Sequence, residues 1–254
     1  MSLRRFYASP DAFRPEPGRV TLSEEESRHL RDVLRLRAGD EARVFDGGGH
    51  EFACVVREVG GRKGRATLEV RGEAEPPSPE PPVSIRLAVA LLKGEKFDLV
   101  VQKAVELGVG LIKPVITKRT DVRLHDERDA AKRVERWQRL ALEAAKQCGR
   151  AWVPDVTPPR AFETFAAADP GLDFLRLMFA ERGGVSLNEL PHQDAPPSHV
   201  TALVGPEGGW EDEEIELARA HGWSIITLGG RTLRAETAAI TVCALLQNLY
   251  GDLR

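Results

Sequence analysis

The sequence predicts a two-domain protein in which a small β-rich domain precedes a larger α/β domain with a parallel sheet. A proline-rich segment, EAEPPSPEPP at 73–82, interrupts the 254-residue chain. Short strands separated by glycine-rich turns come before this segment, and strands that alternate with helices come after it. We therefore expect one domain at 1–72 and another at 83–254, joined by an extended linker at 73–82.

The first domain reads as short strands around one helix. The helix is expected to begin at Ser23-Glu-Glu-Glu26, a capping box in which Ser23 accepts from the Glu26 N–H and the Glu26 carboxylate accepts from the Ser23 N–H. Glycine clusters at 47–49 and 60–64 indicate tight turns. Several short strands with one helix predict a small β-barrel. The expected strands are 4–7, 19–22, 41–46, 51–59 and 66–71.

The second domain changes to alternating strands and helices. Residues 84–92 are almost continuously apolar, which is typical of a parallel strand covered on both faces. The helix at 236–250 is apolar nearly all round, so we expect it in the core or at a subunit interface. Trp137, Trp152 and Trp223 are expected in the core. The expected strands are 84–92, 109–116, 173–180, 200–204 and 223–228, and the expected helices are 95–108, 127–148, 212–221 and 236–250.

Composition excludes several classes of protein. The longest apolar run, 87–92, is too short to span a bilayer, and residues 1–20 contain no apolar signal segment. Three scattered cysteines favour neither disulfides nor a zinc site, and they fit a cytoplasmic protein. The net charge of −3 does not indicate nucleic-acid binding, but residues 118–150 hold ten Lys and Arg against six Asp and Glu. This segment either contacts phosphates or is a solvated helix face.

Three glycine-bearing segments, 179–184, 204–210 and 228–238, each follow a predicted strand. Ligands of open α/β sheets bind at the carboxyl ends of the strands, and glycines leave main-chain groups open to a ligand. Each segment alone can be a simple strand–helix turn, but the three together favour a site for adenine or a small polar cofactor. The P-loop and GxGxxG patterns are absent. Trp210, beside the second segment, is expected either to pack in the core or to line this pocket.

Charged residues stand at the entry to the last helix. Arg231, Arg234 and Glu236 lie among small residues directly before an apolar run. Such a group can bind an anion or orient a polar substrate. The alternative is a structural ion pair between Arg234 and Glu236.

Several motifs resemble the RsmE family, the methyltransferases of the SPOUT superfamily that modify uridine N3 in bacterial 16S ribosomal RNA. The most specific are GPEGG at 205–209 and LGGRTLRAETAA at 228–239, followed by LLQ at 245–247. The resemblance continues in QKAVELGV, EAAKQCGR and HLRDVLRLRAGDEARVFDGGG, at 102–109, 143–150 and 29–49, and so covers nearly the whole chain in order. Trp210, Glu211 and Ala235 stand where the family commonly has Phe, Ser and Thr.

The resemblance implies a PUA-like RNA-binding barrel followed by a domain with a deep trefoil knot. It also implies S-adenosylmethionine (SAM) as cofactor, a homodimer, and 16S ribosomal RNA or the small ribosomal subunit as substrate. The sequence contains no HExxH motif and no Cys/His cluster, so no metal is expected. Two alternatives stay open. A related enzyme would methylate a ribose 2′-hydroxyl or another base, and an RNA-binding or assembly factor would lack catalysis.

The resemblance and the residue pattern together assign roles to individual residues. Arg234 is expected to steady the charge on uracil O2 and O4 as N3 loses its proton, and Glu236 either orients Arg234 or acts as general base. The expected cofactor contacts are Phe179, Ala180, Glu181, Val204, Gly205, Pro206, Glu207, Gly208, Gly209, Leu228, Gly229, Arg231, Leu233, Thr237 and Ala238. The expected RNA contacts are Arg4, Arg5, Arg28, Arg31, Arg35, Arg37, Lys118, Arg119 and Arg123.

Overall fold

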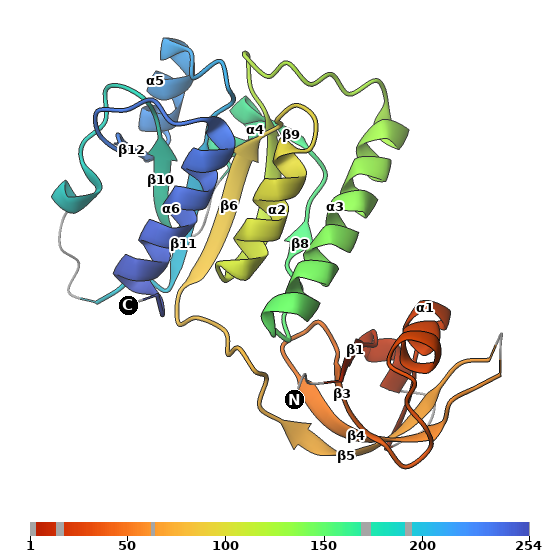
Figure 1. Ribbon diagram of the computed structural model, residues 1–254. Coiled ribbons are helices and arrows are strands. Elements are labelled where there is room, and N and C mark those ends of the chain that lie inside the picture. Colours follow the sequence, from red (N-terminus) through yellow and green to blue (C-terminus); the bar gives the residue numbers. More distant parts are fainter. Residues whose placement is uncertain (1–3, 14–17, 62–63, 169–173, 191–194, 254) are drawn as a thin grey trace. The chain divides into compact units, whose positions relative to one another are not determined.

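The computed structural model describes residues 4–13, 18–61, 64–168, 174–190 and 195–253 (Figure 1). The chain divides into two units. The first comprises Met1–Glu80 together with Ala145–Val153, and the second comprises Pro81–Ala144 together with Pro154–Arg254. The first unit therefore includes residues 145–153, which follow the expected linker by more than sixty positions.

The first unit contains a five-stranded sheet in the order β1-β3-β4-β5-β2. β1 runs parallel to β3, and the other neighbours are antiparallel. Apolar side chains from β1, β2, β3, β4 and β5 form one core under the sheet. Strand β5 continues to Ala74 because Glu73 and Ala74 pair with Phe52 and Glu51, so the strand enters the segment expected as linker. The strands are β1 (Arg5–Tyr7), β2 (Arg19–Thr21), β3 (Glu41–Phe45), β4 (Glu51–Glu58) and β5 (Thr67–Ala74).

One short helix, α1 (Glu24–Arg28), continues directly into a π-helical turn, η2 (His29–Val33). The Ser23 hydroxyl accepts from the Glu26 N–H at 3.1 Å, which is half of the expected capping box. The other half is replaced, because the Glu26 carboxylate accepts instead from Lys146 Nζ at 2.7 Å. The helix start is therefore tied to residues 145–153 of the same unit. A 3-10 turn, η1 (Pro10–Phe13), follows β1.

Arg5 is a structural residue and not an exposed RNA contact, which corrects the expectation from the sequence. Its side chain is only 6% exposed, and Nη2 lies 2.9 Å from the Glu51 carboxylate, which is itself buried. The guanidinium also donates to the main-chain carbonyls of Ala145 and Arg150, at 3.2 and 2.7 Å. Ala145 belongs to the last turn of α3 (Glu127–Cys148), and its carbonyl also accepts from the Gly149 N–H at 3.1 Å. The Arg5 side chain thus joins β1 to β4 and to residues 145–150 within the first unit.

The second unit is built on a parallel sheet in the order β12-β10-β11-β6-β7-β8, with β9 also beside β7. The five longer strands agree with the predicted ones within three residues at each end, whereas the short β8 and β9 carry too little pattern to be predicted. Those five are β6 (Ser84–Ala90), β7 (Val109–Ile116), β10 (Phe174–Phe179), β11 (His199–Val204) and β12 (Ser224–Ile226), and the short ones are β8 (Asp155–Val156) and β9 (Arg160–Ala161).

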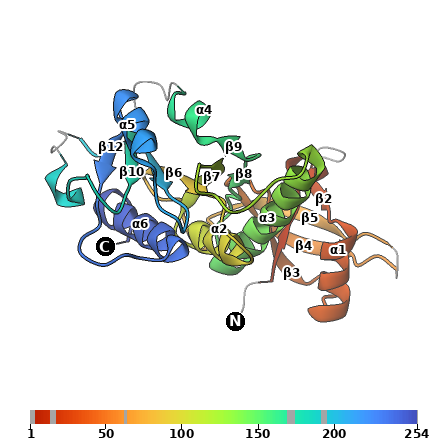
Figure 2. The same ribbon diagram turned by 90° about the horizontal axis from the view of Figure 1, so that it is seen from above.

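Helices cover both faces of this sheet. Figures 1 and 2 place α2 and α6 on one face and α4 and α5 on the other. On the second face the core includes Phe162, Trp210 and Trp223. On the first face, the Gln247 amide of α6 donates to the Leu107 carbonyl after α2, at 2.8 Å. The helices are α2 (Lys96–Glu106), α3, α4 (Phe162–Ala166), α5 (Asp212–Ala220) and α6 (Ala235–Tyr250), and a 3-10 turn, η3 (Leu187–Glu189), follows β10.

The tryptophans divide between core and surface. Trp137 and Trp223 are buried as predicted, with Trp137 against the ring of Phe97. Trp152 is 40% exposed, so its predicted core position is wrong. Its main chain bridges to Gly47 and Gly48 at the glycine turn of the first unit. Apolar character alone therefore did not decide burial.

Removing the buried Arg5 side chain should destabilise the protein strongly. Arg5→Ala leaves the Glu51 carboxylate buried without its cation, a change that typically costs about 3–5 kcal/mol. The matched control is Arg4→Ala, because the neighbouring Arg4 side chain is 49% exposed and its substitution should change the free energy of unfolding by roughly 0.5 kcal/mol or less. Equilibrium unfolding in guanidinium chloride measures both variants. Equal stability of the two would contradict the structural role of Arg5.

Candidate functional site

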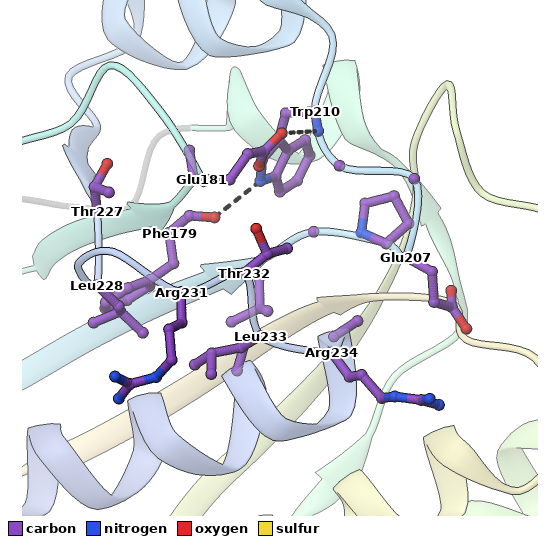
Figure 3. A pocket seen from close by; sticks show the side chains of 18 of the residues that line it. Phe179, Glu181, Glu207, Trp210, Thr227, Leu228, Arg231, Thr232, Leu233 and Arg234 are labelled. Carbon is purple, nitrogen blue, oxygen red and sulfur yellow. Dashed lines mark hydrogen bonds between the residues drawn. The ribbon is translucent and has the colours of Figure 1, made fainter.

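A cavity of about 680 Å³ lies where the loops after β10, β11 and β12 meet (Figure 3). These three strands are neighbours in the sheet, so the loops at their carboxyl ends come together. The volume is within the range of roughly 300–1,000 Å³ that small-molecule sites occupy. The start of α2, which follows β6, completes the wall through Lys96.

The structure places most of the expected cofactor contacts in this wall. Thr237 is the exception, because it is exposed on α6 outside the cavity lining. Arg234 lines the cavity and Glu236 does not. The expected residues that line it are Phe179, Ala180, Glu181, Val204, Gly205, Pro206, Glu207, Gly208, Gly209, Leu228, Gly229, Arg231, Leu233 and Ala238. Lining residues that sequence reasoning missed or left undecided are Lys96, Trp210, Thr227, Gly230, Thr232 and Ala235.

The buried Trp210 side chain packs against the loop after β11. Its indole is 1% exposed, and Nε1 donates to the Phe179 carbonyl at 2.9 Å, which joins this loop to the end of β10 (Figure 3). A Cβ on Gly205 would lie 2.7 Å from that same Nε1, closer than real Cβ contacts allow. Trp210 therefore both packs in the core and lines the pocket, and the two alternatives from the sequence are not exclusive.

Charged side chains brace the same loop from outside. Arg119 donates to the Gly208 carbonyl at 2.9 Å and to the Glu211 carboxylate at 2.8 Å. The Lys118 N–H donates to Glu214 Oε1 at 3.0 Å, and its ammonium pairs with Glu213. The expected RNA contacts Lys118 and Arg119 are thus bound to the start of α5 and to the loop before it.

Lys96 lies between two carboxylates that come from different loops. Its Nζ is 3.0 Å from Glu207 Oε1 and 4.0 Å from Glu236 Oε2. Burial by itself would raise the pKa of Glu207, but the hydrogen bond from Lys96 and those from the main-chain N–H groups of Glu207 and Lys93 outweigh burial and lower this pKa. Glu207 is therefore held as a carboxylate at the cavity wall.

Arg231 and Arg234 have exposed side chains on the loop after β12, and Figure 3 shows the two guanidinium groups pointing away from each other. Arg234 precedes the first residue of α6. Within the described part of the chain no ion pair joins Arg234 to Glu236, so the structural pair considered from the sequence is not formed. Glu236 Oε2 is buried and accepts no hydrogen bond from any described residue.

The described residues offer neither a metal-binding cluster nor a membrane-spanning helix. Across these ranges, no cluster of His, Cys, Asp and Glu is able to hold a metal ion. None of the described helices is both long enough and apolar enough to cross a membrane.

Comparison with known proteins identifies the class. Residues 79–247 match the RNA methyltransferase domain family, and residues 22–69 match the RNA methyltransferase PUA domain family. Ribosomal RNA small subunit methyltransferase E from Synechocystis sp. is 34% identical over 231 residues, 91% of this chain and 73% of that protein. The Bacillus subtilis protein of the same name is 30% identical over 224 residues, 87% of this chain and 86% of that protein.

Solved structures agree with this result. A putative methyltransferase from Legionella pneumophila, in complex with SAM, has 34% identity and a TM-score of 0.87 over the full length of both chains. Ribosomal RNA small subunit methyltransferase E from Neisseria gonorrhoeae, bound to SAM, has 34% identity and a TM-score of 0.85 over 99% of this chain and 100% of that one. The fold and the matched domains define an RNA methyltransferase. The chain belongs to the ribosomal RNA small subunit methyltransferase E family.

Filling the space above Trp210 should destabilise the second unit. In Gly205→Ala the new methyl group meets the indole, and such overpacking typically costs about 1–3 kcal/mol. Gly110→Ala is the control, since a Cβ on this strand glycine would make only ordinary contacts at 3.7 and 3.8 Å. The free energies of unfolding of the two variants decide the point. A Gly205→Ala protein as stable as Gly110→Ala would contradict the packing described for Trp210.

Proposed function

We propose that this protein transfers the methyl group of SAM to N3 of a uridine in small-subunit ribosomal RNA. The observation that carries the proposal is the glycine-lined cavity at the carboxyl ends of β10, β11 and β12, in a chain of this family. The relatives named above act on small-subunit ribosomal RNA by their names, and two similar structures contain SAM.

The cavity wall fits this cofactor. Gly229 has a φ of +91°, and a Cβ on Gly229 or Gly230 would meet no other atom, so main-chain groups are open there to hydrogen-bond an adenosine. The carboxylates of Glu181 and Glu207 also line the wall, where they pair with Arg182 and Lys96. When bound, SAM supplies a methyl group activated by a sulfonium. We assign its binding to the loops that contain Gly205, Leu228 and Leu233.

The protein's own residues must then position uridine and stabilise charge. The N3 proton has to leave, and negative charge then spreads to O2 and O4 of the ring. Arg234 lines the cavity with no described partner, so its guanidinium is available to one of these oxygens. Glu236 does not line the cavity and pairs with no described arginine. This position favours neither a role as general base nor a role in orienting Arg234.

The N-terminal unit is assigned to RNA binding. Arg28 is exposed at the end of α1, Arg35 and Arg37 are exposed after η2, and Arg4 is exposed before β1. These side chains, with Arg123 of the second unit, are the remaining candidates for phosphate contacts. Arg31 is a weaker candidate because it donates to Asp32 and to the Gly61 carbonyl. The target uridine has to be unpaired or turned out of its stack to reach the cavity.

A SPOUT knot and a homodimer complete the proposal. The chain leaves the edge strand β12 and returns to α6, which packs against α2, β6 and β11, and this return path favours a trefoil knot. Helix α6 keeps Leu249 44% exposed, and Leu253 just beyond it is also exposed, which favours a subunit contact there. Methylation of ribosomal RNA implies a cytoplasmic location.

The direct test is methyl transfer from labelled SAM to small ribosomal subunits that lack the modification, with the nucleosides identified by mass spectrometry. We expect 3-methyluridine. A 2′-O-methyl nucleoside or another methylated base would instead support a related enzyme. Binding to RNA without binding to SAM would support a non-catalytic factor.

Truncating Arg234 should slow the chemistry without weakening cofactor binding. The loss of one charge-stabilising donor typically lowers kcat by about 10²-fold. Arg139→Ala is the control, because this arginine is exposed on α3 and does not line the cavity. Steady-state rates give kcat, single-turnover rates give the rate constant of methyl transfer, and calorimetry gives the Kd of SAM. Full turnover by Arg234→Ala with unchanged SAM affinity would contradict the role of Arg234 in stabilising charge on the uracil oxygens.

A further inference from the structure

The mechanism does not use the charged Lys96 side chain of the cavity wall. Lys96 is the first residue of α2, beyond the short connection 91–95 that follows β6, and its ammonium reaches the wall beside Glu207. Glu207 belongs to the loop after β11, and Glu236 belongs to the first turn of α6. Three segments that are distant in sequence thus meet at one ammonium group.

The ammonium has donors to spare. A lysine side chain carries three N–H donors. One is used by Glu207 at 3.0 Å, while the 4.0 Å distance to Glu236 is too long for a hydrogen bond. The Lys96 side chain is 34% exposed and lines the cavity, so the remaining donors are available to a ligand.

Lys96 is also held in place, in contrast to Arg234. The carboxylates of Glu207 and Glu236 flank the ammonium, and Glu236 is only 14% exposed. Donors that are fixed before the reaction stabilise developing charge best, because no reorganisation is needed. Arg234 has no described partner that would fix its guanidinium.

The reaction needs a second donor. N3 of uracil lies between two carbonyl groups, so the charge left by its proton is shared by O2 on one side and O4 on the other. The space directly in front of N3 must stay open for the incoming methyl carbon. One side chain therefore cannot serve both oxygens.

We propose that Lys96 is a second catalytic residue, whose ammonium donates a hydrogen bond to the uracil oxygen that Arg234 does not contact. Glu207 and Glu236 are its positioning residues. N3 gives its proton to water and bonds to the methyl carbon as the carbon–sulfur bond breaks, while Lys96 keeps its three protons. This inference rests on the proposed function.

The test compares Lys96→Met with Lys103→Met. Lys103 lies on the same helix with a similar exposed fraction of 37%, pairs with Glu106, and does not line the cavity. We expect Lys96→Met to lower kcat by about 10²-fold with an unchanged Kd for SAM, and Lys103→Met to match the wild type. Lys96→Arg should retain most of the rate, and Glu236→Gln should lose part of it. Thermal unfolding checks that each variant is folded.

A more acidic substrate separates charge stabilisation from a structural role. Ribosomal RNA that contains 5-fluorouridine at the target loses the N3 proton more easily and places less charge on O2 and O4. The ratio of wild-type to Lys96→Met rate should therefore shrink on this RNA, and it should shrink in the same way as the pH is raised. For Glu236→Gln we expect the same behaviour on a smaller scale.

The outcomes are distinguishable. If the wild type forms no 3-methyluridine, the proposed function fails. If the wild type forms it and Lys96→Met is equally fast, only the inference fails. The inference is also overturned if 5-fluorouridine leaves the ratio of the wild-type rate to the Lys96→Met rate unchanged. A third contrary result is weaker SAM binding by Lys96→Met with an unchanged kcat, which would make Lys96 a cofactor contact.

Discussion

The close packing of the Trp210 indole against Gly205 is the contact on which the site depends. The indole fills the space under the loop after β11, and its N–H binds the carbonyl that ends β10. Two of the three loops are thereby fixed to each other and to the core on that face of the sheet. Open space beside Gly229 and Gly230 leaves main-chain groups of the third loop accessible, which suits a ligand recognised through hydrogen bonds.

Several basic side chains form ion pairs and hydrogen bonds within the protein and are not free to contact RNA. The chain holds 36 Lys and Arg, yet several of those expected to contact RNA are bound within their own unit. Arg5 joins Glu51 to the end of α3, and Arg119 joins Gly208 to Glu211. Arg182, after β10, donates to the Trp210 carbonyl and to Asp212, and so braces the same loop from another side. Local positive charge in a sequence is therefore a poor guide to which cations remain free.

Much of the fold was predictable, because strand and helix periods and turn glycines are local signals. The five longer strands of the second unit and its long helix follow from them, and parallel-strand geometry places three loops at one edge. Burial of individual side chains depends on distant partners, so Arg5, Glu26 and Trp152 were misjudged. Lys96 was missed because periodicity does not reveal that β6 lies beside β11, although the rule for the carboxyl ends of strands applied to it as well.

A crystal structure of the protein with SAM tests the account most directly. We predict that the cofactor lies against the main chain of Gly205, Leu228 and Leu233, and that the hydrogen bond from Trp210 Nε1 to Phe179 is unchanged. A preformed site of this kind moves little when its ligand binds. Cofactor bound outside this cavity, or an indole displaced from beneath Gly205 on binding, would contradict the central claim.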